Sequence, residues 1–166
     1  MVPLSSIFHT GAGHGIPEAA QDQDGRRGHT KTTLDFGIKG KYALVTAGSR
    51  GIGRAIALAL AREGCHVAVC ARTAESLSDT CRLIQSLGVN AKGIAVDAAN
   101  PAAAQKSVIE ILDAWGTLHI LVNNLGGGGR WGKTFADTAD KTWMEVYEKN
   151  AMSAVRFTRM VMPSMV

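Results

Sequence analysis

A glycine-rich turn at residues 46–53 carries the clearest chemical information in this sequence. It reads Thr-Ala-Gly-Ser-Arg-Gly-Ile-Gly and links an apolar run to residues with helical spacing, which predicts a strand before it and a helix after it. The free backbone N–H groups and the dipole at such a helix N-terminus favour a bound phosphate. The candidate ligand-binding residues of this turn are Thr46, Gly48, Ser49, Arg50, Gly51, Ile52 and Gly53.

Individual residues of this turn have separate expected roles. Gly51 leaves out a side chain where a pyrophosphate must approach, and Gly53 lets the helix pack closely on the sheet. Ser49 adds a hydroxyl donor and Arg50 adds a cation. The alternative is a tight strand-to-helix turn that binds nothing.

The end of the second predicted strand carries a cation where many dinucleotide-binding folds have an acid. In those folds a carboxylate about 20 residues past the glycines binds the ribose 2′-hydroxyl of NAD. Here the strand is followed by Ala71 and Arg72. Arg72, helped by Arg50, could pair with a 2′-phosphate, so the sequence predicts NADP(H) as the preferred cofactor and leaves NAD(H) possible. The alternative is a solvent-facing arginine just after a strand.

An acidic residue follows the third predicted strand. Asp97, which precedes Ala98, could accept a hydrogen bond from an adenine amino group, or it could cap the following turn. Both interpretations stay open, and both residues are candidate cofactor-binding positions. The three cysteines fit no metal spacing, and His9, His14 and His29 could be imagined as ligands but are expected to be solvated side chains, so no metal site is expected.

Two consecutive amides and a run of glycines follow the fourth predicted strand. Asn123 and Asn124 end a buried strand, and we expect them to tie this loop to the neighbouring strand ends and to brace the floor of a cofactor site. Gly126 begins four consecutive glycines, which indicate a flexible loop. Asn124 and Gly126 are the candidate cofactor-binding residues here. Trp131, after Arg130, lines a substrate pocket or packs as an ordinary loop aromatic.

Strands that alternate with helices from residue 36 onward must position these residues. Such alternation favours right-handed βαβ units, and hence an α/β fold of the Rossmann type with a doubly wound parallel sheet. Ligands of such sheets bind at the carboxyl ends of the strands, where the candidate residues fall. The predicted strands are 42–46, 66–70, 90–96 and 118–122, and the last predicted helix runs from residue 140 towards 166.

Composition excludes several classes of protein. The 166 residues are 46% hydrophobic and 19% charged, which is typical of a globular chain, and no apolar run is long enough for a membrane span. The net charge of +4 comes from scattered residues, so neither nucleic acid nor membrane is an expected partner. Three cysteines without metal or disulfide spacing indicate a reducing, cytoplasmic compartment. Residues 1–35 lack apolar periodicity, which predicts a disordered N-terminal extension before a domain at 36–166.

Taken together, these motifs resemble the short-chain dehydrogenase/reductase family. TAGSRGIG at 46–53 is similar to the family's TGxxxGxG, NNLG at 123–126 to its NNAG, and ART at 71–73 to its NADP-preferring members. Asn150 in EKNAMSAV resembles the asparagine of the family's catalytic tetrad. The resemblance, strongest to beta-ketoacyl carrier-protein reductases, implies hydride transfer between NADP(H) and a small carbonyl or alcohol substrate. It also implies homo-oligomers.

The sequence departs from the family pattern in three places. Ala47 replaces the first glycine of the turn and is expected to crowd it, and Leu125 replaces the small residue of NNAG. The family's Tyr-x-x-x-Lys pair has no counterpart, since neither Tyr42 nor Tyr147 has a lysine four residues on. We therefore expect an incomplete Rossmann domain with strand order 3-2-1-4, truncated after the fourth strand and its helix, and inactive alone.

An incomplete domain leaves other functions open. The chain could be a dinucleotide-binding module or remnant without catalysis. A different Rossmann enzyme, such as a methyltransferase, is disfavoured because Arg72 stands where the ribose of its cofactor needs an acid. The fourth strand would be an uncovered edge and the last helix would expose apolar side chains, so we expect marginal stability unless a partner covers them.

Overall fold

The computed structural model of the chain describes residues 35–128 and 134–165. Four parallel strands form one sheet in the order β3-β2-β1-β4, which confirms the predicted order and the Rossmann-type fold. The predicted extension at 1–35 lies outside the described residues except for Asp35, as do Arg130 and Trp131. The strands are β1 Tyr42–Thr46, β2 His66–Ala71, β3 Ala91–Ala95 and β4 Ile120–Val122.

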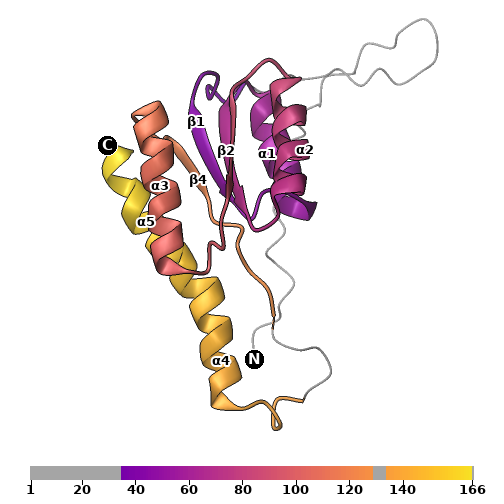
Figure 1. The fold of residues 1–166 in the computed structure, drawn as a ribbon, viewed down its shortest axis with the longest axis vertical. Coiled ribbons are helices and arrows are strands. Elements are labelled where there is room, and N and C mark those ends of the chain that lie inside the picture. Colours follow the sequence, from indigo (N-terminus) through magenta and orange to yellow (C-terminus); the bar gives the residue numbers. More distant parts are fainter. Residues whose placement is uncertain (1–34, 129–133, 166) are drawn as a thin grey trace, which may run out of the picture. The chain divides into compact units, whose positions relative to one another are not determined.

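Helices cover both faces of the sheet, as expected of a doubly wound fold. In Figure 1, α1 and α2 lie on one side of the sheet, and α3 and α5 lie together on the other. None of the helices in the described ranges is long and apolar enough to cross a membrane. The helices are α1 Gly51–Arg62, α2 Ala74–Gln85, α3 Pro101–Trp115, α4 Asp140–Tyr147, the π-helix Glu148–Met152, α5 Ser153–Val161 and the 3-10 turn Met162–Ser164.

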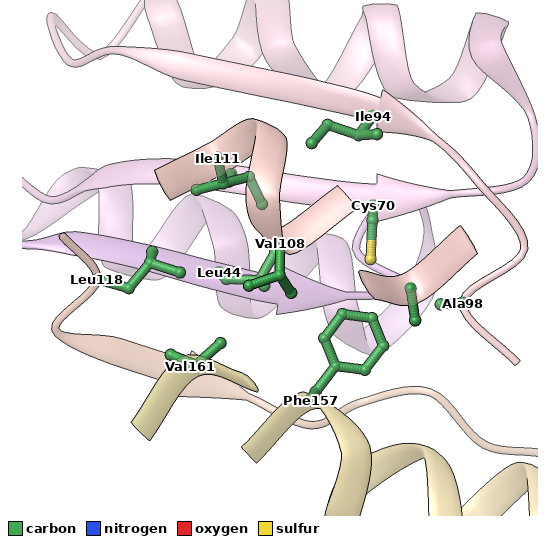
Figure 2. Close-up of a cluster of buried hydrophobic side chains, with 11 residues drawn as sticks. Leu44, Cys70, Ile94, Ala98, Val108, Ile111, Leu118, Phe157 and Val161 are labelled. Atoms are coloured by element: carbon green, nitrogen blue, oxygen red, sulfur yellow. The ribbon is translucent and has the colours of Figure 1, made fainter. Parts of the chain in front are cut away.

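Alternation along the strands builds two hydrophobic cores, one on each face of the sheet. Leu44 and Cys70 point towards α3 and α5, where Phe157 is almost fully buried (Figure 2). Val45 and Val69 point to the opposite face, towards α1 and α2. Because both faces are covered, these strands read as continuous apolar runs in the sequence.

The helix α3 shows why these segments fold as predicted. Asn100 caps it, with its side chain accepting a hydrogen bond from the backbone nitrogen of Ala103 at 3.0 Å, and Pro101 occupies the first helical position. Gly116 ends the helix in the left-handed conformation, with φ of 74°. Both ends of this helix are therefore fixed by capping residues that can be recognised in the sequence.

Some predicted boundaries are wrong. β4 is shorter than the predicted 118–122 and β3 shorter than 90–96, whereas β2 extends one residue further, to Ala71. Leu118 is fully buried without pairing as a strand, because burial alone produces the same apolar pattern. The predicted long helical stretch from residue 140 is confirmed, since α4, the π-helix, α5 and the 3-10 turn follow one another from Asp140 to Ser164. The sequence does not predict the π-helical turn at Glu148–Met152 within it.

Candidate functional site

A cavity of about 450 Å³ lies at the carboxyl ends of the strands, where the sequence places its candidate site. Its walls come from the glycine-rich turn, from the segments that follow β2, β3 and β4, and from the π-helix. One hollow therefore runs across the carboxyl edge of the whole sheet. The predicted residues that line it are Ser49, Arg50, Arg72, Asp97, Ala98, Asn124 and Gly126.

Thr46, at the end of β1, joins the first strand to the loop after β4. Its hydroxyl oxygen accepts hydrogen bonds from the backbone nitrogens of Asn124 at 2.8 Å and Leu125 at 3.0 Å. The hydroxyl donates in turn to the carbonyl of Val122 at 3.2 Å. The Asn124 side-chain amide donates to the carbonyls of Thr46 at 3.0 Å and Ala47 at 3.2 Å. The expected bracing of the site floor by Asn124 is thus present, with Thr46 as its centre.

Asn123 behaves differently from its neighbour. Its side-chain amide donates to the hydroxyl of Thr158 at 3.1 Å, so it holds the loop to α5. We predicted that both amides reach neighbouring strand ends, and for Asn123 this is wrong. Alternation explains the difference, because successive residues at a strand end point in opposite directions.

The glycine-rich turn is shaped by two close approaches. A Cβ added to Gly48 would lie 2.1 Å from a methyl carbon of Val69, and one added to Gly53 would lie 2.3 Å from the side-chain nitrogen of Asn124. Ala47 has φ of 51°, in the left-handed region that favours glycine. A Cβ on Gly53 would also lie 2.6 Å from the carbonyl oxygen of Ala47, so this glycine makes room both for the Asn124 amide and for the close approach of α1 to the turn after β1. The unusual feature of Ala47 is its backbone conformation.

The turn presents the N-terminus of α1 to the cavity. Arg50 is the N-cap, and among the described residues its side chain makes no capping bond. Gly51 has φ of 55°, and a Cβ placed there would meet no described atom within 4 Å. Free first-turn N–H groups at a helix N-terminus can bind an anion, and the residues of the turn that line the cavity itself are Ala47, Ser49 and Arg50. Ile52, another predicted residue, is 76% exposed in the first turn.

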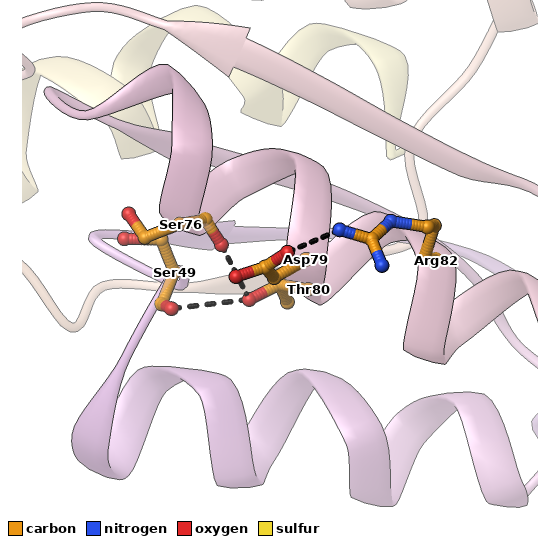
Figure 3. Close-up of polar contacts among 5 residues, drawn as sticks. All are labelled: Ser49, Ser76, Asp79, Thr80 and Arg82. Carbon is orange, nitrogen blue, oxygen red and sulfur yellow. Dashed lines mark hydrogen bonds and ion pairs between the residues drawn. The ribbon is translucent and has the colours of Figure 1, made fainter.

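Thr80 of α2 fixes the backbone of the turn. Its buried hydroxyl lies 3.0 Å from the carbonyl oxygen of Ser49 and 2.9 Å from that of Ser76 (Figure 3). Asp79 and Arg82 form an exposed ion pair on the same helix. Anchoring the Ser49 carbonyl to α2 leaves the N–H groups that follow free to face the cavity.

Two cations of the cavity lie beside the ends of β1 and β2. Arg50 and Arg72 are both exposed and both line the cavity, and no described carboxylate forms an ion pair with either. Asp97 lines the far part of the cavity, and its Oδ1 accepts a hydrogen bond from the backbone nitrogen of Ala99 at 3.1 Å. Asp97 therefore stabilises its turn, one of its two predicted roles, and its second oxygen remains for another partner.

Asn150 lies in the π-helix and holds the loop after β4. Its side chain accepts from the backbone nitrogen of Gly127 and donates to the carbonyl of Gly127, both at 2.9 Å. It also donates to the carbonyl of Val146 at 2.7 Å. A side chain that takes a helix carbonyl perturbs the regular helical ladder, and π-helical turns are frequent at functional sites. The sequence identifies Asn150 but not the π-helix around it.

Lys149 is a cavity residue that the sequence analysis missed. It is half-buried and lines the cavity next to Asn124, Leu125 and Gly126. Its ammonium nitrogen lies 2.8 Å from the position that a Cβ on Gly127 would occupy. The only sequence feature that could have indicated Lys149 is its position directly before Asn150, which the sequence analysis had already identified as a candidate site residue.

Cys70 forms part of the cavity wall from β2. Burial raises the pKa of its thiol to about 11, so it remains protonated at neutral pH. The cavity therefore offers cations, a carboxylate, amides and N–H groups, but no activated thiol from this residue.

Comparison with known proteins identifies a family for most of the chain. The short chain dehydrogenase family matches residues 41–166. A 3-oxoacyl-acyl-carrier-protein reductase of rhamnolipid biosynthesis from Pseudomonas aeruginosa is 34% identical over 128 residues, which cover 77% of this chain and 49% of that protein. A ketoacyl reductase from Nostoc sp. is 32% identical over 128 residues, covering 77% and 44%.

A solved structure has the same arrangement. L-sorbose reductase from Gluconobacter frateurii, complexed with NADPH and L-sorbose, superimposes with a TM-score of 0.74 at 38% identity. The match covers 80% of this chain and 50% of that one. The chain spans about half the length of the relatives it matches.

Proposed function

The chain belongs to the short chain dehydrogenase family, and on that premise we propose that it binds NADP(H) within an oxidoreductase of small carbonyl or alcohol compounds. One observation carries the cofactor proposal. The residue after β2 that lines the cavity is Arg72, where a carboxylate would read the 2′-hydroxyl of NAD. Two relatives by structure, L-sorbose reductase and a metagenomic short-chain oxidoreductase, were crystallised with NADPH and NADP.

The residues around the cavity fit a dinucleotide. The N–H groups at the start of α1 and the space over Gly51 suit a pyrophosphate. Arg50 and Arg72 suit a 2′-phosphate, because planar guanidinium groups form paired, charge-assisted bonds with phosphate oxygens. Asp97 keeps one carboxylate oxygen for an adenine amino group. NAD(H) remains a weaker ligand in this proposal, since it lacks the phosphate that the arginines would bind.

The chemistry that such a cofactor supplies when bound is hydride transfer to or from a carbon bearing oxygen. Asn150 is the residue of this chain that we propose to contribute to that chemistry, through the loop it holds at Gly127. The family's tyrosine and lysine, which handle the proton, have no counterpart in the sequence. We propose that the 166-residue chain alone does not turn over substrate, because Tyr42 and Tyr147 both lack the lysine.

The missing tyrosine–lysine pair also favours a second candidate function. A chain that holds the cofactor site without that pair could serve as a dinucleotide-binding module. The two candidates share the cavity and differ in catalysis. A rate assay with NADPH and a panel of small ketones separates them when residues 1–166 are fused to the second half of a relative such as L-sorbose reductase, which this chain does not cover. Only the first candidate predicts NADPH oxidation by that fusion.

We propose that the protein is cytoplasmic and assembles with further copies of itself. Cys65, Cys70 and Cys81 are free thiols, in keeping with a reducing compartment such as the cytoplasm. Trp143, Met144 and Tyr147 of α4 are about half exposed or more, in keeping with a protein that assembles with further copies.

Calorimetric titration of the 166-residue chain with NADPH and with NADH tests the cofactor proposal. We expect NADPH to bind at least about ten-fold more tightly, the smallest effect of one charge-assisted contact. Equal affinities would contradict the role of Arg72. Absence of binding by a chain with a cooperative thermal transition would overturn the dinucleotide site itself.

A further inference from the structure

Lys149 is a third cation of the cavity, and the proposed 2′-phosphate contacts leave it without a role. It is half-buried in the π-helix, with its ammonium beside Gly127. The neighbouring carboxylate of Glu148 is paired with Arg156. No carboxylate in the described ranges lies within ion-pair distance of Lys149. The cavity therefore holds an unneutralised positive charge at this end.

Sheet order shows which end of a dinucleotide this charge would meet. Arg72 follows β2 and marks the adenosine end, because the residue after the second strand reads the adenosine ribose. β1 and its glycine-rich turn lie between β2 and β4. A dinucleotide that begins at Arg72 and crosses the turn reaches the loop after β4, where Gly126 and Lys149 line the cavity. Lys149 thus stands at the nicotinamide end.

We propose that Lys149 makes the site prefer the reduced cofactor, NADPH, over NADP⁺. This inference rests on the proposed NADP(H) function and concerns its redox selectivity. The two forms differ only at the nicotinamide ring, which carries a positive charge in NADP⁺ and none in NADPH. An ammonium at that end repels the oxidised ring and leaves the reduced ring unaffected. The consequence is that, at equal concentrations of the two forms, the site loads preferentially with NADPH, the form that a carbonyl reduction consumes.

The size of the effect follows from the surroundings of Lys149. Because the lysine is half-buried, the two charges are partly solvated, and the expected effect is about a five-fold difference in affinity. A lysine that bound a phosphate would behave differently, since both forms carry the same phosphates and both would weaken together. The ratio of the two dissociation constants therefore separates these roles.

Calorimetric titration of the 166-residue chain with NADPH and with NADP⁺ tests the inference. Lys149→Met removes the charge and keeps most of the length, and we expect the affinity ratio to fall about five-fold, chiefly through tighter NADP⁺ binding. Lys149→Arg keeps the charge and should keep the wild-type ratio. Lys141→Met, on the exposed part of α4 outside the cavity, is the matched control and should change nothing. Titration with 2′,5′-ADP checks that each variant keeps the adenosine end intact.

Each outcome decides the matter. A lower ratio in Lys149→Met alone supports the inference. An unchanged ratio, or equal weakening of both forms, overturns it while leaving the NADP(H) proposal standing. Failure of the wild-type chain to bind either form would instead overturn the proposed function, and with it this inference.

Discussion

Thr46 Oγ1 lies 2.8 Å from the backbone nitrogen of Asn124, although 78 residues separate the two in the sequence. The same oxygen accepts from Leu125 and donates to Val122, so one buried hydroxyl satisfies three backbone groups, one at the end of β4 and two in the loop after it. A hydroxyl offers one donor and two acceptor lone pairs, and all three are used here. The floor of the cavity depends on this one side chain.

Replacement of Thr46 by valine keeps the shape and removes the oxygen. The N–H groups of Asn124 and Leu125 then lose their partner, and we expect a loss of about 1–3 kcal/mol in the free energy of unfolding. Thr46→Ser retains the hydroxyl and should cost less. Urea unfolding of both variants measures the difference. Equal losses would show that the methyl group, rather than the hydroxyl, matters.

Neighbouring residues of the glycine-rich turn should respond in opposite ways. Ala47→Gly relieves a left-handed backbone and should stabilise the chain by up to about 1 kcal/mol, after the entropy that glycine adds to the unfolded state. Gly48→Ala places a carbon 2.1 Å from Val69 and should destabilise by about 1–3 kcal/mol. Thermal unfolding measures both. Destabilisation by Ala47→Gly would contradict strain at this position.

Arg72 should control the choice between NADPH and NADH. Arg72→Gln removes the cation, and we expect at least about a ten-fold loss of NADPH affinity with little change for NADH. Arg62→Gln, at the exposed end of α1 away from the cavity, is the control. Fluorescence titration with both cofactors measures the effect. Parallel loss of both affinities would point to a structural role for Arg72.

Asn150 should protect the Gly127 amide from exchange with solvent. Gly127 is exposed, so its protection depends on the bond to Asn150 Oδ1. Asn150→Ala removes that acceptor and should speed hydrogen exchange at Gly127 by about five-fold or more. Asn150→Asp keeps an acceptor and should retain much of the protection. Fast exchange in the wild-type chain would show that the bond is not populated in solution.

Cys70 makes stability depend on pH in the alkaline range. Burial raises the pKa of this thiol from 9.0 to about 11, so the folded chain keeps a proton that the unfolded chain loses. The contribution of this protonated thiol to the free energy of unfolding is present in full below pH 9. It is lost as the pH rises towards about 11, by roughly 2 kcal/mol. Cys70→Ala should flatten the decline of the unfolding free energy between pH 8 and 10.5. Identical slopes in both chains would contradict the raised pKa.

Much of the fold could be predicted because local signals and burial agree. The runs at 42–46 and 66–70 are covered on both faces, and Asn100, Pro101 and Gly116 mark helix ends by their own chemistry. β4 was predicted too long because Leu118 is buried by helices without pairing to β1. A run of apolar residues indicates that a segment is buried. Whether the segment pairs as a strand depends on the backbone of the neighbouring strand.

The candidate site was only partly visible in the sequence. Arg72 and Asn124 point to it because each polar residue falls where an apolar strand ends, whereas Asn150 was singled out only by the resemblance of EKNAMSAV to the family's motif. The π-helix was not predictable, since it involves Asn150 bonding with both Val146 and the distant Gly127. Lys149 was missed for the same reason, because its position depends on that helix.

The long sequence separation between Thr46 and Asn124 also affects the order in which the parts of the site fold. The glycine-rich turn, α1 and β2 are near neighbours in the sequence and can assemble from local contacts. The floor beside β4 needs closure of a loop of 78 residues and a parallel pairing, which are entropically costly and slow. We expect the part of the cavity around the glycine-rich turn and Arg72 to form early in folding, and the part beside β4 to form only when the fourth strand docks.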